Sequence, residues 1–219
     1  MQNDGYLLKN ELHEQAITHR IGLYLQRLFP DWDVDCEWNK NGDKPKSLSI
    51  SAEELLQTMK HIAIDMIDSY QRGDGHRVLN LSKEPISIAN LKFIVRKIRL
   101  GEIRTVEIEG KEYYELSIPH DVIRIPVRPD IIIHRRGRSD NLAVIEAKKV
   151  TKEVAKKQKY EIAKNLDLLK LGAFLSDPSY GYQNAYFLEL TTGNDYYGTG
   201  EYIILSNEHD ERIKILQRK

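Results

Sequence analysis

Two short apolar runs separated by a polar, basic segment stand out in the second half of the chain. Residues 131–133 are three consecutive isoleucines, and residues 142–145 are Leu-Ala-Val-Ile. The seven residues between positions 134 and 142 include three arginines, a glycine, an aspartate and an asparagine. Short β-branched runs bounded by turn residues are typical of strands. The pattern therefore predicts a β-hairpin, and its continuous apolar runs indicate strands that are covered on both faces.

The remaining pattern predicts helices and strands in alternation, which indicates an α/β fold. Residues 10–29 have apolar residues at helical spacing, and Pro30 would end that helix. Three further helices are predicted at residues 51 to about 70, 88–99 and 151–174. The first of these three opens with Ser51 and Glu54, which is a capping-box pattern. Strands are predicted at residues 32–38, 105–109, 112–116, 185–190 and 202–205, with the last at a sheet edge.

The segment from residue 51 to residue 118 has two interpretations. Its predicted order of helix, helix and two-stranded ribbon is also that of a winged-helix DNA-reading insertion. In that case the phosphate contacts would be the basic residues of the second helix, Lys92, Arg96, Lys97 and Arg99. The favoured interpretation is that the helices extend the core and that the hairpin belongs to its sheet. We therefore expect one domain over residues 1–219, with 51–118 as an insertion or extension.

Charged side chains flank the predicted 131–145 hairpin at one end. Asp130 precedes the first strand, Glu146 and Lys148 end the second, and fifteen residues separate Asp130 from Glu146. An antiparallel hairpin of this length brings the start of one strand beside the end of the other, and side-chain alternation puts Glu146 and Lys148 on one face. Two adjacent carboxylates repel each other unless a cation lies between them, and a hard divalent cation prefers oxygen ligands. With Lys148 to orient a water, the set fits metal-assisted hydrolysis of a phosphodiester.

Pro129-Asp130 followed by Glu146-Ala147-Lys148 resembles the signature of the PD-(D/E)xK nuclease superfamily. The run from Asp35 to Asn39, Asp-Cys-Glu-Trp-Asn, is similar to the first core strand of uncharacterised bacterial members. The resemblance implies a restriction-endonuclease-like core, with a central mixed sheet flanked by helices and a helical and hairpin insertion. It also implies a nuclease, acting on DNA as an endonuclease with Mg²⁺ or Mn²⁺ and leaving a 5′-phosphate.

The resemblance also implies a set of metal ligands. Asp130, Glu146 and the carbonyl of Ala147 would hold the metal. An acid from the first helix often completes such sites, and Glu14 is the first choice for it. Glu11 is the reserve, and Glu37 is a third candidate that is expected to pair with a basic residue instead.

Charge is balanced over the whole chain but not around the motif. The chain has 33 basic and 33 acidic residues, whereas residues 128–164 have eleven basic and five acidic ones. A local basic excess is what a phosphate backbone requires. The candidate contacts to the phosphate backbone of a nucleic acid are Arg128, Arg135, Arg136, Lys149 and Lys152.

Two other functions fit the same residues. A catalytically inactive nucleic-acid-binding module would keep the fold and bind without cleaving, and a structural protein would use Asp130, Glu146 and Lys148 as a salt-bridge cluster. RNA remains open as a partner beside DNA, and cutting both strands would favour a homodimer. Cys36 is the only cysteine, so no intrachain disulfide forms. No membrane-length apolar run or signal-peptide pattern is present, so a soluble cytoplasmic protein is expected.

Overall fold

The computed structural model describes residues 5–41, 44–51, 54–55, 57–58, 66–73, 76–83, 88–98, 103–118, 122–150, 154–193, 202–206 and 214–215. They form a mixed α/β structure that divides into two compact units. The first unit holds residues 1–46, 127–154 and 170–219, and the second holds residues 47–126 and 155–169. No helix among the described residues is long and apolar enough to span a bilayer.

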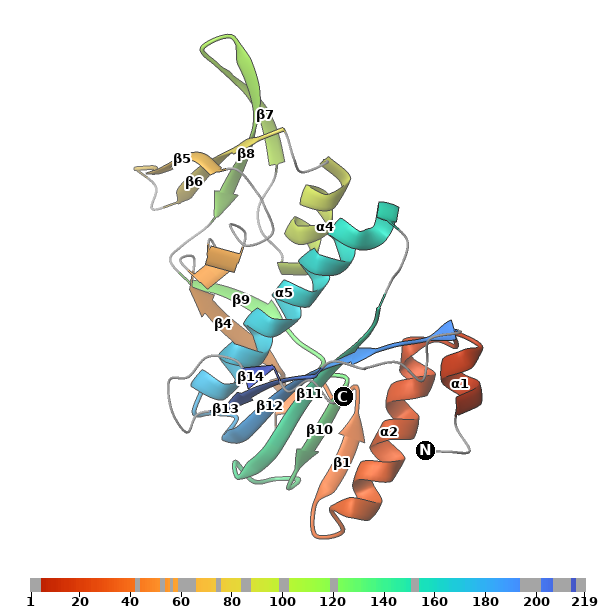
Figure 1. Ribbon diagram of the computed structural model, residues 1–219. Coiled ribbons are helices and arrows are strands. Elements are labelled where there is room, and N and C mark those ends of the chain that lie inside the picture. Colours follow the sequence, from red (N-terminus) through yellow and green to blue (C-terminus); the bar gives the residue numbers. More distant parts are fainter. Residues whose placement is uncertain are drawn as a thin grey trace. The chain divides into compact units, whose positions relative to one another are not determined.

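A six-stranded mixed sheet organises the first unit (Figure 1). Its strands, in spatial order, are β1 (Asp33–Cys36), β10 (Ile131–His134), β11 (Asn141–Lys149), β12 (Tyr182–Leu190), β13 (Tyr202–Ser206) and β14 (Lys214–Ile215). All neighbours are antiparallel except β11 and β12, which are parallel. A parallel pair needs a long crossover, and α5 (Val154–Ser176) lies between these two strands in the sequence. The predicted mixed sheet is confirmed, but β13 is not the edge strand because β14 pairs with it.

The predicted hairpin at residues 131–145 is confirmed by the pairing of β10 with β11. Ile131 lies opposite Ile145 and Ile133 opposite Ala143. All four residues of β10 are buried, as expected for a strand covered on both faces. The strands predicted at residues 32–38 and 185–190 are also present, as β1 and β12.

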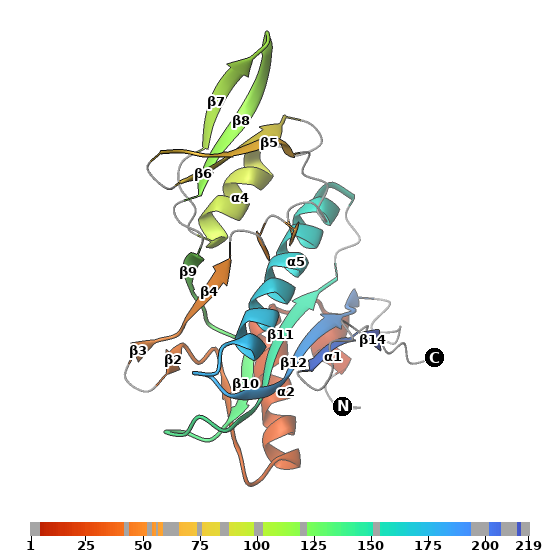
Figure 2. The ribbon, with the colours of Figure 1, turned by 90° about the vertical axis from the view of Figure 1, so that its left-hand side faces the viewer.

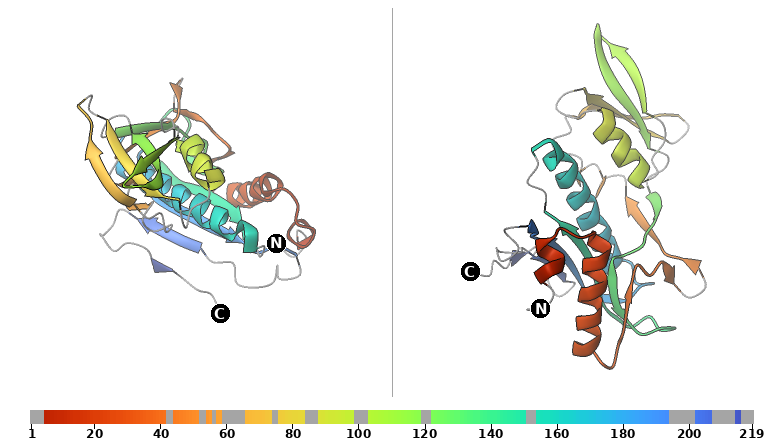
Figure 3. Two further views of the ribbon diagram at one scale, coloured as in Figure 1. Left: turned by 90° about the horizontal axis from the view of Figure 1, so that it is seen from above. Right: turned by 90° about the vertical axis from the view of Figure 1, so that its right-hand side faces the viewer.

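The first predicted helix is shorter than its apolar pattern suggested. It is α2 (Glu14–Leu28), and a separate short helix, α1 (Gly5–Lys9), precedes it (Figure 3). Glu11 breaks the helical run because its backbone has a φ of 52°, in the left-handed region. Helix α2 packs on β1, where a Cβ at Gly22 would lie 2.7 Å from the Cys36 Sγ. This close approach partly buries Cys36 against the helix, and burial raises the pKa of its thiol to about 11.

The second unit has two smaller sheets. One is four-stranded, in the order β5 (Met66–Gln71), β6 (Arg77–Ser82), β8 (Lys111–Ile118) and β7 (Ile103–Ile108), and α4 (Ile88–Ile98) lies beside it (Figure 2). The other pairs β4 (Ser47–Ser51) with β9 (Val122–Pro126). A two-residue pair, β2 (Lys40–Asn41) with β3 (Lys44–Pro45), belongs to the first unit.

The structure corrects two predictions for residues 51–118. The helix predicted to reach residue 70 is wrong from Met66 onward, because residues 66–71 are strand β5. The predicted 105–116 hairpin exists as β7 and β8, but it pairs with β6 in a separate sheet and does not join the six-stranded one. The capping box is confirmed, since the Glu54 N–H donates to Ser51 Oγ (3.1 Å) and the Ser51 N–H donates to Glu54 Oε2 (2.9 Å).

Candidate functional site

Asp130 lies against the end of β11 that carries Glu146 and Lys148. The pairing of Ile131 with Ile145 sets Asp130 opposite Glu146 in the register. The backbone N–H of Ala147 donates a hydrogen bond of 2.8 Å to Asp130 Oδ2. Glu146 is 7% exposed, and Lys148, two residues on along the same strand face, is partly buried. The hairpin thus brings together the three residues that the sequence motif names.

Glu14 is the acid that reaches this strand from α2, the helix in which it was predicted. It is the first residue of α2, and its Oε2 accepts a hydrogen bond of 2.9 Å from the Lys149 N–H. Glu11 lies outside the helix, and its carbonyl accepts from the Lys149 ammonium at 2.8 Å. Glu37 accepts from Gln15 Nε2 at 2.7 Å and lies 3.7 Å from the Arg128 guanidinium, so its predicted pairing with a basic residue is confirmed.

The oxygen donors near this strand end suit a hard cation by type. They are the carboxylates of Asp130 and Glu146 and the carbonyl of Ala147. The Asp130 and Glu14 carboxylates each bind a backbone N–H of β11 through one oxygen. Over the part of the chain that the structure describes, no three His, Cys, Asp or Glu side chains are grouped closely enough to hold a metal.

The predicted phosphate contacts lie in different places. Arg128 is exposed beside Glu37, whereas the Lys149 ammonium binds the carbonyls of Glu11 and Leu12. Arg135 and Arg136 follow β10, so they lie at the end of the hairpin opposite to Asp130. Lys152 lies outside the described residues. The basic loop of the hairpin is therefore not beside the acids of the motif.

A charged cluster fixes that opposite end of the hairpin. His134 Nε2 lies 2.7 Å from Asp35 Oδ2, and Arg136 donates to both oxygens of Asp35, through Nε at 3.0 Å and Nη2 at 2.6 Å. Burial acts to raise the pKa of Asp35, but the hydrogen bonds from Arg136 and His134 outweigh it and lower that pKa. The Trp38 ring lies 5.9 Å from the His134 ring and 5.8 Å from the Arg136 guanidinium.

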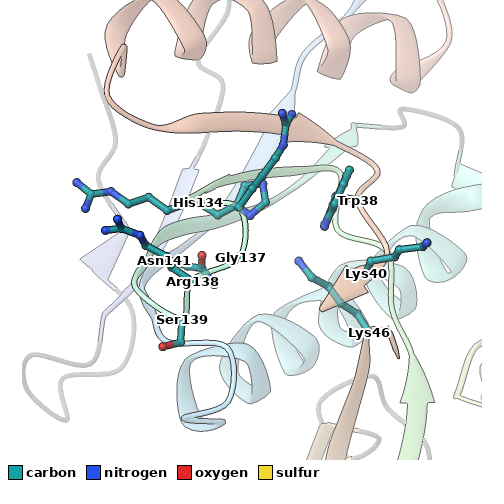
Figure 4. Close-up of a pocket in the computed structure, with 10 residues that line it drawn as sticks. Trp38, Lys40, Lys46, His134, Gly137, Arg138, Ser139 and Asn141 are labelled. Carbon is teal, nitrogen blue, oxygen red and sulfur yellow. The ribbon is translucent and has the colours of Figure 1, made fainter. Parts of the chain in front are cut away.

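A pocket of about 460 Å³ opens beside this cluster. We name it the basic pocket (Figure 4). Its lining residues come from the segment 38–46, which follows β1 and contains β2 and β3, and from the β10–β11 hairpin. They are Trp38, Lys40, Lys46, His134, Arg135, Arg136, Gly137, Arg138, Ser139 and Asn141. Arg135 and Arg136 were expected from the sequence to contact a phosphate backbone, whereas no local pattern marks Lys40 or Lys46 as part of a site.

Lys46 is the most unusual residue of the basic pocket. It is 4% exposed, and its ammonium donates to the Tyr182 hydroxyl at 2.9 Å. Burial lowers the pKa of Lys46 from 10.5 to about 8, and the negative charge of Asp35 only partly opposes this. Tyr182 lies 136 residues further along the chain, so the burial of Lys46 is a product of tertiary structure.

The stability of the protein should rise with pH because of Lys46. Between its folded pKa of about 8 and the ordinary value of 10.5, the unfolded state binds more protons, so raising the pH favours folding. From about pH 7 to about pH 9 the gain is on the order of 1 kcal/mol. Urea unfolding of wild type and Lys46→Met at both pH values would measure it. The variant should lack this gain, and Lys40→Met, which removes an exposed lysine, should keep it; an equal pH response in all three proteins would contradict the assignment.

Comparisons of the chain with protein-family models, with curated proteins and with solved structures found no match. The function must therefore be argued from the chain's own residues.

Proposed function

We propose that the protein is a metal-dependent nuclease of the PD-(D/E)xK type, built on a restriction-endonuclease-like core. The observation that carries the proposal is the contact between Asp130 and the Glu146-Ala147-Lys148 strand end, with 2.8 Å between Asp130 Oδ2 and the Ala147 nitrogen. An Asp and a Glu from adjacent strands, with a Lys on the same face as the Glu, are the groups that hydrolysis of a phosphodiester needs.

The order of the strands supports the proposed core. The antiparallel strands β1, β10 and β11 are followed by α5 and then by β12, which is parallel to β11. A helix directly after the Glu-x-Lys strand is what the nuclease core requires. The helix α2 supplies Glu14 to the same strand end.

Each residue has a proposed role. Asp130, Glu146 and the Ala147 carbonyl would hold Mg²⁺, and Mn²⁺ would be an alternative metal. When bound, the metal supplies a Lewis acid that polarises the phosphate and lowers the pKa of a water. Lys148 would orient the attacking water and meet the charge that develops on phosphate. Glu14 would fix the end of β11 through the Lys149 N–H or complete the metal shell.

The proposed substrate is DNA, with internal cleavage and a 5′-phosphate product. The exposed Arg128, next to the acids in the sequence, is the first candidate contact to the backbone. We propose no role in substrate binding for the Lys149 ammonium, because it already binds two backbone carbonyls.

The second candidate is a nucleic-acid-binding module without hydrolytic activity. It is favoured by one observation: the described residues contain no group of three metal-binding side chains. In this case Asp130 would have a structural role, as acceptor of the Ala147 N–H.

A cleavage assay separates the two candidates. The purified protein would be titrated with Mg²⁺ and Mn²⁺ on plasmid, linear duplex, single-stranded DNA and RNA, with Asp130→Ala as the inactive control. Metal-dependent cleavage by wild type alone would support the nuclease, and the preferred substrate would separate endonuclease from exonuclease action. Binding of nucleic acid without cleavage at any metal concentration would instead support the binding module. If the protein neither binds nor cleaves nucleic acid, the remaining interpretation is a structural salt-bridge cluster. That interpretation predicts no metal binding, which calorimetry with Mn²⁺ would test.

A further inference from the structure

The basic pocket is separate from the proposed catalytic site. Asp130 precedes the first residue of β10, whereas His134 is its last residue and lines the pocket. Four strand residues span about 13 Å. A ligand in the pocket therefore meets a different set of side chains from a phosphodiester at Asp130.

The lining of the basic pocket carries cations and no carboxylate. Five of its ten residues are Lys or Arg, a sixth is His134, and none is Asp or Glu. Asp35 and Asp33 already hold Arg136, and Asp140 lies 3.3 Å from Arg135. Lys40 and Arg138 are exposed and form no ion pair with any described residue, so both can turn toward an anion. The pocket is thus suited to a negatively charged ligand.

Lys46 is the strongest sign of a missing anion. Its ammonium points toward the hairpin loop that carries Arg138, whereas the neighbouring Lys40 side chain points the other way (Figure 4). Its partners are the hydroxyl of Tyr182 and the faces of the Tyr180 and Tyr182 rings, at 6.0 and 5.5 Å from Nζ. No described carboxylate forms an ion pair with it. A buried ammonium without a paired carboxylate destabilises the fold, since the charge of Asp35 offsets the effect of burial only in part, and a bound phosphate would supply the missing partner.

The pocket is larger than a phosphate and contains groups that fit a nucleobase. Its volume of about 460 Å³ lies in the range of small-molecule sites. The indole of Trp38 offers a ring for stacking, and stacking on aromatic side chains is a common way to hold a base. Asn141, which is 7% exposed, donates through its amide nitrogen to the Tyr180 carbonyl. Its Oδ1 is buried and has no hydrogen-bond partner among the described residues.

We propose that the basic pocket binds a nucleotide, with its phosphate on Lys46, Lys40 and Arg138 and its base against Trp38. The nucleotide is either a free nucleoside monophosphate or the 5′-phosphorylated end of a nucleic acid, which present the same phosphate and base. This site does not depend on the proposed hydrolysis. It would act as a sensor or an anchor at the end of the hairpin that carries no motif residue.

Binding can be measured without any cleavage. The full chain would be titrated, in EDTA, with the four nucleoside monophosphates, with inorganic phosphate, and with oligonucleotides that carry or lack a 5′-phosphate. EDTA removes the metal that the proposed nuclease needs, so a failed nuclease would leave this result unchanged. Saturable binding of a mononucleotide would identify the free ligand, and binding of the phosphorylated oligonucleotide alone would identify a nucleic-acid end.

Substitutions of the lining residues test whether the nucleotide binds in the basic pocket. Arg138→Ala should weaken binding about tenfold, which corresponds to one charge-assisted hydrogen bond, and Lys46→Met should weaken it further. Arg138 is exposed, so its loss should leave the melting temperature unchanged. Arg124→Ala removes another exposed arginine, on β9, and should bind like wild type. The proposal is overturned if no nucleotide binds at millimolar concentration, if Arg138→Ala binds like Arg124→Ala, or if inorganic phosphate or the unphosphorylated oligonucleotide binds as tightly.

Discussion

Lys148→Ala should lower the rate of DNA cleavage by about a thousandfold, within the range found for groups that position or transfer a proton in hydrolysis. Lys148 lies two residues after the buried Glu146 on one strand face, at the end of β11 that Asp130 contacts. Alanine leaves no positive charge at that position. Initial rates at saturating Mg²⁺ would give the effect, and far-UV circular dichroism would show that the fold is retained.

Two further variants make this result specific to the position. Lys157→Ala removes an exposed lysine of α5 and should cleave at the wild-type rate. Lys148→Arg keeps the positive charge but changes its geometry, and it should recover only part of the activity. A Lys148→Ala protein that cleaves within threefold of wild type would eliminate the proposed role of this residue.

Asp35→Ala should lower the free energy of unfolding by about 3 kcal/mol, because it leaves the buried His134 ring without its hydrogen-bond acceptor. Asp35 is 15% exposed in its side chain and accepts hydrogen bonds from His134, which is 8% exposed, and from Arg136. The Arg136 side chain is 57% exposed and can return to water, so most of the loss comes from His134. Urea unfolding near neutral pH would measure the change.

Asp33 offers the matched control for Asp35. Its carboxylate also contacts Arg136, accepting from the backbone N–H at 3.1 Å and lying 3.7 Å from Nη1, but its side chain is 41% exposed. Such surface pairs contribute about 1 kcal/mol or less, so Asp33→Ala should be mild. Since the pKa of Asp35 is lowered, its contribution to stability is present above its ordinary pKa and is lost as the pH falls through the lowered value. Equal losses in the two variants, or a loss unaffected by acidification, would contradict this account of Asp35.

The proximity of Asp130 to Glu146 and Lys148 was predictable because it depends only on the local pattern of one hairpin. Two apolar runs and a turn segment define a hairpin, and a hairpin register places Asp130 beside Glu146 without reference to the rest of the chain. The capping box of Ser51 and Glu54 was predictable for the same reason. The start of α2 was not, because the carbonyls of Glu11 and Leu12 bind the ammonium of Lys149 in place of helical partners.

The strands β5 and β6 were missed because a helix-like apolar pattern precedes them, and the basic pocket was missed because segments distant in the sequence form it. The apolar spacing up to Met66 resembles a helix, yet β5 pairs with β6, and β6 pairs with β8, more than thirty residues later. Tertiary pairing overrides a local preference of this size. The local sequence of Lys46 is that of a surface lysine, and its burial depends on the contact with Tyr182, which is distant in the sequence. From the sequence, Arg135 and Arg136 were expected to contact a phosphate backbone beside the motif, but they lie at the end of the hairpin away from Asp130.

The loop of the β10–β11 hairpin packs tightly against Gly181, the residue before β12. Gly181 has a φ of +61°, and a Cβ built on it would lie 1.7 Å from the Ser139 carbonyl oxygen. The Gly181 carbonyl accepts a hydrogen bond from the Asn141 N–H at 3.2 Å. Backbone packed this closely on backbone leaves no room for a side chain at position 181. The loop that bears Arg138 is thus preorganised at its base, and binding loses little entropy in ordering it.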